Sequence, residues 1–580
     1  MRPSSRKWLF GTVAAVGVAA AAAAVPGLET RRQADQLALP PVPPSVLPTK
    51  LATPLLAVGR AVLADVYWML ATRSKEQGRI FDAYQLARTI CELQPRFASV
   101  WAFQAWNMSY NISVTLKTPE ERWRWVRNGY ELLRDQGIPL NPHNTQLYRE
   151  LAWILYHKVG DTLDDHHFYY KLQFALQMED ILGPPPADYV RPGRVRDDYY
   201  REYDFAPLAA APRTLAEVMR REEVAALVER LRPFGFDVMQ PGVYLGLIAA
   251  LREGGVRVPT AADDQQSIRV KELTELMSEP GTRAAREALE HFWRSHRLRN
   301  EVKLDPERIV DLQKGFGVSF DWRLPHTHAL YWANLGLEQT SSRQEVIDIH
   351  RLNTNRIEFY CLQKMFHGGR IAMSPNARLG EPPLMMPDVR MVPILFEAFQ
   401  RDSKEYLERE SVAKPVSENF RSGFVGFMRS AVLRYNELGM DREAREMFAF
   451  LREHFPDPMY EKGLDGFLLE QARIDRIEIR DARSAIARIK ALLARGFVQL
   501  AYDEDEEGGR YLRRAKQVYD FYESDVVSDR LRIPFTYQQI LEQAAHEIGG
   551  GMYRQSYERI CRKLGLTPMP AESGSAQPSP

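Results

Sequence analysis

Apolar residues recur three or four positions apart along most of this chain, the spacing that places side chains on one face of an α-helix. The pattern predicts three helix pairs within residues 51–183 and further helix pairs within residues 396–566. Between them, residues 184–303 indicate an irregular helical insert, and residues 304–395 a central region of long helices. We therefore expect an all-α protein.

Two local signals stand out in the central region. Asp305 followed by Pro306 predicts a helix start, with the aspartate as N-cap and the proline in the first turn. The stretch from His367 to Pro393 is rich in Gly, Pro and Met. It predicts a long loop or a short hairpin, the one clear non-helical insertion in the sequence.

The amino-terminal segment, residues 1–29, has three basic residues among its first seven positions. Residues 8–25 then carry no charge, and as a helix they would extend about 27 Å, close to the thickness of a bilayer core. The basic start favours an anchor with its amino terminus inside. Alternatively, the alanines ending at Ala24 form the cleavage site of a signal peptide. Both interpretations place the body beyond the cytoplasmic membrane, in a periplasm, and the length of the run favours a single-pass anchor.

A proline-rich linker, residues 30–50, follows this segment, and we expect it to be extended. At the other end, residues 567–580 are mostly Ser, Pro, Gly and Ala without an apolar pattern. That composition predicts a disordered tail.

The helical body contains one spacing twice. In each case a glycine is followed five residues later by an alanine and twelve residues after that by a proline. The two sets are Gly78, Ala83 and Pro95, and Gly439, Ala444 and Pro456. Glycine permits a tight turn, the small alanine lets two helices approach closely, and proline ends the second helix.

These spacings, together with Tyr435 and Phe448, resemble the tetratricopeptide repeat (TPR), a two-helix unit of about 34 residues. Clear matches cover about a third of the chain. The runs Trp101–Asn111 and Asp321–Pro325 also resemble segments of bacterial membrane-anchored TPR-like proteins. The resemblance implies an α-solenoid of stacked helix pairs whose concave face binds a protein or peptide.

Composition narrows the possible functions. The chain has 580 residues, too many for one compact core, with 77 Lys and Arg against 76 Asp and Glu and a net charge of +1. Without a basic field, nucleic acid is not an expected partner. Its cysteines, Cys91, Cys361 and Cys561, stand far apart, which argues against a disulfide framework and a structural zinc site.

Histidines are the first candidates for chemistry. His326 and His328 could ligate one metal from a strand, but two positions apart on a helix they point about 200° apart. His350 and His367 would complete a site only if the fold gathers all four side chains. The segment Asp164–His167 also combines acids with histidines, but it lies at an expected turn, where capping and solvation explain it.

Aromatic and arginine side chains near these histidines are candidates for partner binding. Tryptophan and arginine anchor many interfaces, but they also anchor cores, with the arginine paired to a buried acid. We take five residues as candidate partner-binding residues, with core packing as the competing interpretation: Trp322, Arg323, His326, His328 and Trp332.

Phosphate-loop, Gly-x-Ser-x-Gly and His-Glu-x-x-His motifs are absent from the sequence. We therefore expect a membrane-anchored TPR-like scaffold that mediates protein–protein interaction on the outer side of the cytoplasmic membrane, without catalysis, cofactor or metal. The alternative is an enzyme or metal-binding protein whose site lies within residues 300–395, carried by helical repeats. The sequence indicates neither the oligomeric state nor the identity of the partner.

Overall fold

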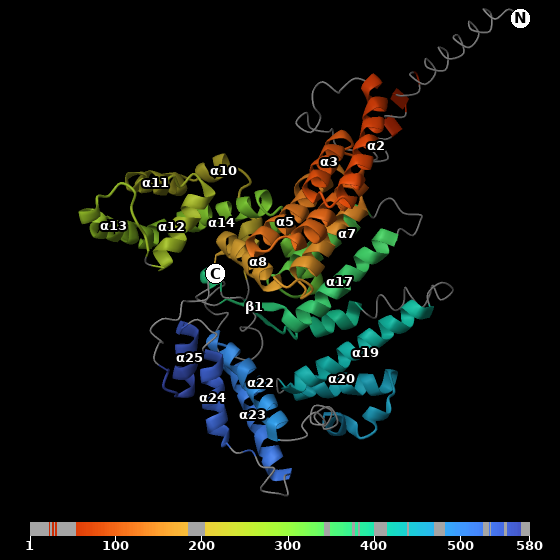
Figure 1. Ribbon diagram of the computed structural model, residues 1–580. Coiled ribbons are helices and arrows are strands. Elements are labelled where there is room, and N and C mark those ends of the chain that lie inside the picture. Colours follow the sequence, from red (N-terminus) through yellow and green to blue (C-terminus); the bar gives the residue numbers. More distant parts are fainter. Residues whose placement is uncertain are drawn as a thin grey trace, which may run out of the picture. The chain divides into compact units, whose positions relative to one another are not determined.

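A computed structural model (Figure 1) describes five positions between residues 23 and 31 and then residues 54–183, 203–253, 255–340, 349–373, 377–380, 383–398, 414–437, 440–468, 482–525, 533, 535–549 and 554–569. Apart from those five positions, the predicted membrane segment 8–25 and the linker 30–50 lie outside the described residues. The tail from residue 570 onward also lies outside them. None of the described helices combines the length and the apolar composition needed to cross a bilayer.

The chain folds as two compact units. Unit 1 comprises Met1–Lys117, Arg124–Glu150 and Gly336–Ile347, and unit 2 comprises Thr118–Trp123, Leu151–Leu335 and Asp348–Pro580. Helices predominate in the described parts of both units, which confirms the predicted all-α class. In those parts, strand is limited to β1 (Arg370–Ala372) and β2 (Leu384–Met386).

Unit 1 is built from successive helices, some of which continue into unit 2. They are α2 (Pro54–Glu76), α3 (Ile80–Leu93), α4 (Ala98–Trp106), α5 (Pro119–Leu132), α6 (Ile138–Leu140) and α7 (Thr145–Trp153), with a 3-10 turn η3 (Ser113–Thr115). Three π-helical segments continue α4, α5 and α7, namely η2 (Asn107–Ile112), η4 (Leu133–Gly137) and η5 (Ile154–Val159). The three predicted helix pairs correspond to α2 with α3, α4 with α5, and α7 with α8 (His167–Leu182).

The first occurrence of the glycine–alanine–proline spacing forms a helical hairpin, α2–α3 (Figure 1). Gly78 has a φ of +71°, and after it the Arg79 N–H donates to the Ser74 carbonyl at 2.8 Å, which ends α2. Ala83 is 6% exposed. α3 ends at Leu93, two residues before Pro95, as the spacing predicts.

The second occurrence also forms a helical hairpin, α19–α20 (Lys414–Glu437 and Asp441–His454), and two described features beside its turn match those of the first. The Met440 N–H donates to the Tyr435 carbonyl at 2.8 Å, the counterpart of the bond from Arg79. The residues that precede α3 and α20 have nearly equal dihedral angles, φ −84° and ψ 69° in one case and φ −87° and ψ 62° in the other. Ala444 is fully buried, and Gly439 lies outside the described residues. One local backbone therefore occurs twice, while stacking into a TPR solenoid stays a prediction.

Unit 2 contains the remaining helices. They are α9 (Ala206–Ala209), α10 (Leu215–Met219), α11 (Glu222–Leu231), α12 (Pro241–Glu253), α13 (Gln266–Ser278), α14 (Arg283–Asn300), α15 (Pro306–Phe316), α16 (Pro325–Gln339), α17 (Ile349–Gly368), α22 (Ala482–Ala501), α23 (Asp505–Asp525), α24 (Tyr537–Gly549) and α25 (Arg554–Leu564). Short 3-10 turns are η7 (Arg232–Phe234), η8 (Asp263–Gln265), η9 (Pro280–Thr282), η11 (Ala377–Leu379) and η12 (Pro458–Tyr460).

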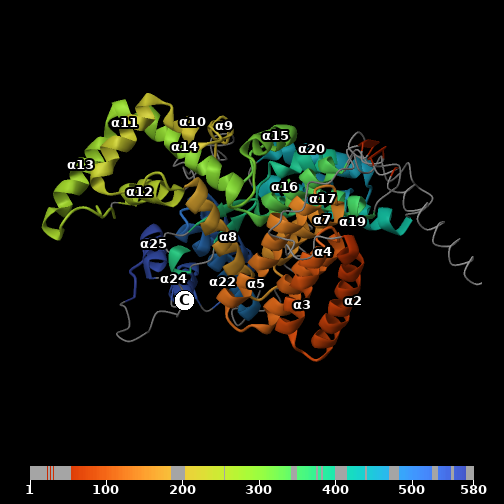
Figure 2. The same ribbon diagram turned by 90° about the horizontal axis from the view of Figure 1, so that it is seen from above.

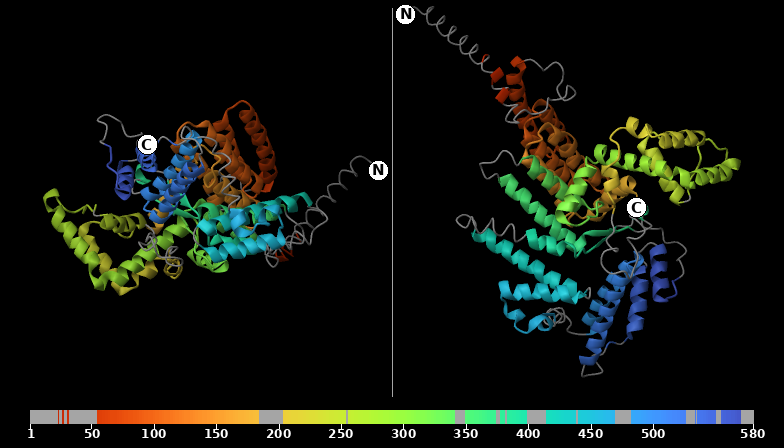
Figure 3. Two further views of the ribbon diagram at one scale, coloured as in Figure 1. Left: turned by 90° about the horizontal axis from the view of Figure 1, so that it is seen from below. Right: turned by 180° about the vertical axis from the view of Figure 1, so that it is seen from behind.

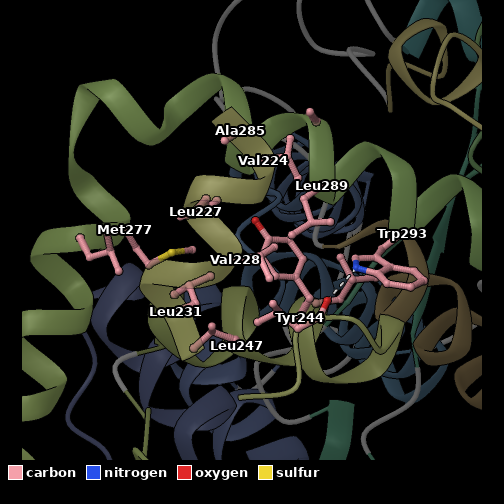
Figure 4. Close-up of a cluster of buried hydrophobic side chains, with 14 of the residues drawn as sticks. Val224, Leu227, Val228, Leu231, Tyr244, Leu247, Met277, Ala285, Leu289 and Trp293 are labelled. Carbon is pink, nitrogen blue, oxygen red and sulfur yellow. Dashed lines mark hydrogen bonds between the residues drawn. The ribbon is translucent and has the colours of Figure 1, made fainter. Parts of the chain in front are cut away.

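Helices α10 to α14 lie together (Figures 2 and 3) and enclose a hydrophobic core of their own (Figure 4). Val224, Leu227 and Leu231 follow helical spacing, so one face of α11 enters this core. Two aromatic side chains of this core donate hydrogen bonds to backbone carbonyls. The Tyr244 hydroxyl donates to Arg286 O at 3.1 Å, and the Trp293 indole N–H donates to Val238 O at 3.1 Å. The sequence indicates only an irregular helical insert here.

In the central region, the structure contains both features that the local sequence signals predict. The Asp305 carboxylate accepts a hydrogen bond from the Glu307 N–H at 3.2 Å, so it caps α15 with Pro306 in the first turn, as predicted. The predicted non-helical insertion contains β1 and β2, an antiparallel pair in which Ile371 lies opposite Met385. A further hydrophobic core joins α22 to α25.

Candidate functional site

All five candidate partner-binding residues are buried in unit 2. Their exposed fractions are 4% or less, for Trp322, Arg323, His326, His328 and Trp332. A partner protein cannot reach these side chains in this conformation. Core packing, the competing interpretation, accounts for their positions.

Arg323 ties the segment before α16 to two other elements. Its Nε and Nη2 donate to Asp321 at 3.0 and 2.9 Å, and its Nη1 donates to Glu179 of α8 at 2.7 Å. Nη2 also donates to the Ile371 carbonyl of β1 at 2.6 Å, and the Ile371 N–H donates to Asp321 at 3.1 Å. Arg323 and Asp321 are 1% and 2% exposed, so this is a buried ion pair that depends on a full set of hydrogen bonds.

The four histidines of the alternative metal site do not come together. The Nε2–H of His328 donates to the Trp322 carbonyl at 2.9 Å, so this nitrogen carries a proton and cannot ligate a metal. His350 and His367 lie near opposite ends of α17, about 26 Å apart along the helix axis. Within the described residues, no group of three or more His, Cys, Asp or Glu side chains is arranged to hold a metal ion.

His326, in the first turn of α16, lies in a polar cluster of unit 2. Its ring stands edge-on to Tyr156 at 5.8 Å, and its Nε2 lies against Gly160, where an added Cβ would approach to 2.7 Å. Neither ring nitrogen has a hydrogen-bond partner among the described residues. Burial, reinforced by the charges of Lys171 and Lys364, lowers the pKa of His326 to about 3, so the imidazole is neutral.

Two lysines and an aspartate complete this cluster. Lys171 of α8 donates from Nζ to the Asp161 carbonyl at 2.9 Å and lies 2.9 Å from Nδ1 of His167. Lys364 of α17 binds the Asp161 carboxylate at 2.9 Å. Burial lowers the pKa of Lys171 to about 8, although the charge of Asp161 opposes this shift. Burial acts to raise the pKa of Asp161, but hydrogen bonds from Lys364 and from the Thr162 N–H, together with the charge of Lys364, outweigh it and the pKa is lowered.

The acid–histidine segment Asp164–His167 belongs to the same loop, between η5 and α8. The Asp164 carboxylate accepts hydrogen bonds from Lys158 Nζ at 2.5 Å, from the His166 N–H at 2.9 Å and from the Tyr170 hydroxyl at 3.2 Å. The aspartate therefore shapes the turn before α8, as capping would require. The sequence presents this segment and His326 as separate candidates, and the fold brings them into one cluster.

A pocket of about 340 Å³ lies within unit 1, between α3, α4 with η2, and α5 with η4. Its apolar lining includes Cys91, Trp101 and Met108, and its polar lining includes Gln104 and Glu131. This volume is at the lower end of the range for ligand pockets. Nothing in the residue spacing predicts it.

Two glycines and two π-helical segments shape this pocket. An added Cβ on Gly129 would lie 2.8 Å from the Ala105 carbonyl, and one on Gly137 would lie 3.4 Å from Trp101 Cβ, so α4 and α5 approach closely. Met108 lies in η2 and Asp135 in η4. A π turn contains one residue more than an α turn and rotates the side chains that follow, which makes such turns frequent at functional sites.

Unit 1 also exposes an apolar face on its first helix, which we call the α2 apolar surface. Its members recur at helical spacing and have exposed fractions between 38% and 64%: Val62, Leu63, Val66, Met69 and Leu70. Monomeric proteins rarely expose a contiguous apolar face of this kind without a binding role. The α2 apolar surface and the pocket are the candidate functional sites of the described chain.

Comparison of the chain with protein-family models, with curated proteins and with solved structures found no match.

Proposed function

We propose that this chain is a non-catalytic scaffold that binds a helical element of a protein partner on the α2 apolar surface. Residues 8–25 would hold it on the outer side of the cytoplasmic membrane. The proposal does not include catalysis.

The two hairpins that share the glycine–alanine–proline spacing support this proposal. Positions counted back from that turn pair three residues of α2 with three of α19: Leu63 with Phe424, Val66 with Phe427, and Leu70 with Ala431. The α2 members are 38%, 39% and 44% exposed, whereas the α19 members are 0%, 3% and 0% exposed. At these three positions, side chains are therefore covered in the second hairpin and open in the first.

Helical elements cover that face in α19. The ring of Phe427 lies 5.1 Å from the ring of Phe366, which belongs to α17, and the ring of Phe424 lies 6.2 Å from that of Phe396. Burying one large apolar side chain contributes about 1.5–3 kcal/mol. A helix packed on α2 in the same way would cover several side chains at once, so its binding would be favourable.

The charges of α2 favour a protein over a lipid surface. A helix that lies in a membrane interface combines one apolar face with a polar face rich in Lys and Arg. The exposed charged residues of α2 instead have both signs, as Asp65, Arg73 and Glu76 show. We therefore take the partner to be an apolar helix of a protein.

Photocrosslinking in cells tests this proposal. The photoreactive amino acid p-benzoylphenylalanine replaces Met69, the most exposed member of the surface, in the full-length protein. We expect one discrete adduct with another protein after irradiation. The same probe at Lys117, an exposed polar position of unit 1, is the matched control and should give none.

A second substitution makes the result specific. Val66→Asp places a charge beside the probe, and it should abolish the Met69 adduct while leaving circular dichroism unchanged, because Val66 is already 39% exposed. Adducts confined to lipid, to a second copy or to the chain's own amino-terminal segment would each overturn the proposal. An adduct that survives Val66→Asp would overturn it as well.

A further inference from the structure

We propose that the pocket between α3, α4 and α5 binds a basic side chain, arginine or lysine, of the partner protein. This inference rests on the proposed function, because the pocket belongs to the same unit as the α2 apolar surface. It adds the chemistry by which the partner would be recognised.

Glu131 provides the charge in this pocket. Its carboxylate is 27% exposed and pairs loosely with Arg134 at 3.5 Å and with Arg127 at 3.8 Å. Both distances exceed those of strong charge-assisted hydrogen bonds, which are about 2.7–2.9 Å. Burial raises the pKa of Glu131 despite these two guanidinium groups, so a further cation beside the carboxylate would be stabilising.

The other acids of the pocket are already paired more closely. Asp135 accepts two hydrogen bonds from Arg134, at 2.7 and 2.9 Å. Glu92 lies 3.3 Å from Arg88, and both side chains are largely exposed at the rim. Glu131 is therefore the carboxylate with the weakest compensation among the three that line the pocket.

Gln104 provides a second acceptor. It is 1% exposed, and its Nε2 donates to the Tyr84 carbonyl at 3.2 Å, which fixes the orientation of the amide. The Oε1 atom then has no hydrogen-bond partner among the described residues. A buried acceptor without a partner is destabilising, and a donor brought by a ligand would remove that cost.

The apolar lining fits the stem of a basic side chain. Trp101 and Met108 line the pocket beside Gln104, and an arginine or lysine stem packs well on such groups while its charged head reaches an acceptor. The lining itself contains three carboxylates and the Gln104 amide oxygen but only one guanidinium group, that of Arg88, so it presents more acceptors than cations to a ligand. Arg127 and Arg134, which pair with Glu131 and Asp135, are not part of the lining. Charge and shape together select a cation on an aliphatic stem.

Methyl NMR on the full-length protein tests the inference. The methionine methyl groups are ¹³C-labelled, the Met108 signal is assigned with Met108→Leu, and the probe is the peptide acetyl-Ala-Arg-Ala-amide. The control peptide contains citrulline, which keeps the shape of arginine and lacks its charge. We expect the arginine peptide to shift the Met108 signal in a saturable way and the citrulline peptide to bind at least tenfold more weakly.

Variants at two carboxylates locate the binding site. Glu131→Gln should weaken the arginine peptide about tenfold or more, whereas Glu92→Gln, at the rim, should change its affinity by less than about twofold. Equal binding of both peptides, no shift with either, or unchanged affinity of Glu131→Gln would overturn the inference. The adduct at Met69 is judged independently of these titrations, so the scaffold proposal and the basic-side-chain inference can fail separately.

Discussion

Acid should destabilise unit 2 through one histidine. His326 is buried without a hydrogen-bond partner for either ring nitrogen among the described residues, and it lies near Lys171 of α8 and Lys364 of α17, with Asp161 as the nearby anion. Protonation would add a third cation to this buried cluster. The folded state therefore resists protonation at a pH where the unfolded chain accepts a proton.

The pKa values give the size of this effect. An imidazole in an unfolded chain titrates near pH 6.5, and His326 in the folded chain titrates near 3. Because the folded pKa is the lower one, the stability contributed by the neutral imidazole is complete above pH 6.5 and is lost as pH falls toward 3. Proton linkage gives a loss of about 2 kcal/mol at pH 5 and about 4 kcal/mol at pH 3.

Two measurements on the full-length protein check this prediction. Deuterium exchange at the imidazole C2 position, read by mass spectrometry, reports the pKa of each histidine, and fragmentation separates His326 from His328. Backbone hydrogen exchange of α16 in a urea series then reports the local unfolding free energy at pH 7.5 and pH 5. We expect the wild-type chain to lose about 2 kcal/mol more between these pH values than His326→Gln loses.

His454→Gln is the matched control, because His454 is exposed and its removal should leave the acid loss of α16 unchanged. The reasoning is refuted if His326 titrates near pH 6.5 in the folded chain. It is equally refuted if His326→Gln loses as much stability in acid as the wild type, since the proton would then bind elsewhere.

Further substitutions test the packing of unit 2. For each variant, the unfolding free energy is measured by urea denaturation with backbone hydrogen exchange as the readout. Arg323→Ala should destabilise it by about 3–5 kcal/mol because it leaves a buried carboxylate unpaired, whereas Arg378→Ala, at an exposed ion pair, should cost less than about 1 kcal/mol. Equal effects would contradict the buried pairing. Gly160→Ala should cost about 1–3 kcal/mol because its Cβ would clash with His326, while Gly246→Ala, in open space within α12, should stabilise by about 0.5–1 kcal/mol. If Gly160→Ala stabilises the protein, the His326 imidazole does not lie against Gly160 and the reasoning is wrong.

Local signals in the sequence predicted local structure well. Gly78 and Pro95 mark where α2–α3 turns and ends, and Asp305 caps α15, because each effect depends on the backbone of a few neighbouring residues. The arginine at position 323 was expected to meet a buried acid if it lay in a core, and Asp321 is that acid.

Features that join residues far apart in the sequence could not be predicted from such local signals. The cluster around His326 joins Asp161 to Lys364, which is 203 residues away in the chain, so no spacing could show it. The pocket depends on η2 and η4, and a π turn arises where tertiary packing forces one extra residue into a helix. Such a residue shifts the apolar spacing by only one position, which is too small a change to identify a π turn in the sequence, and the pocket was therefore not predicted.

The choice between core and interface also depends on context that a sequence lacks. Trp322 combines an apolar ring system with a polar N–H group, as residues that anchor interfaces do. Inside the fold, its indole N–H donates to the Gln313 side-chain oxygen at 2.9 Å. Leu70 and Ala431 illustrate the converse, since equal places in equal hairpins are open in one case and covered in the other. A two-helix unit cannot bury both of its faces by itself, so its neighbours decide which face remains open. If a partner helix covers α2 as we propose, it would take the place that α17 takes beside Phe427 of α19.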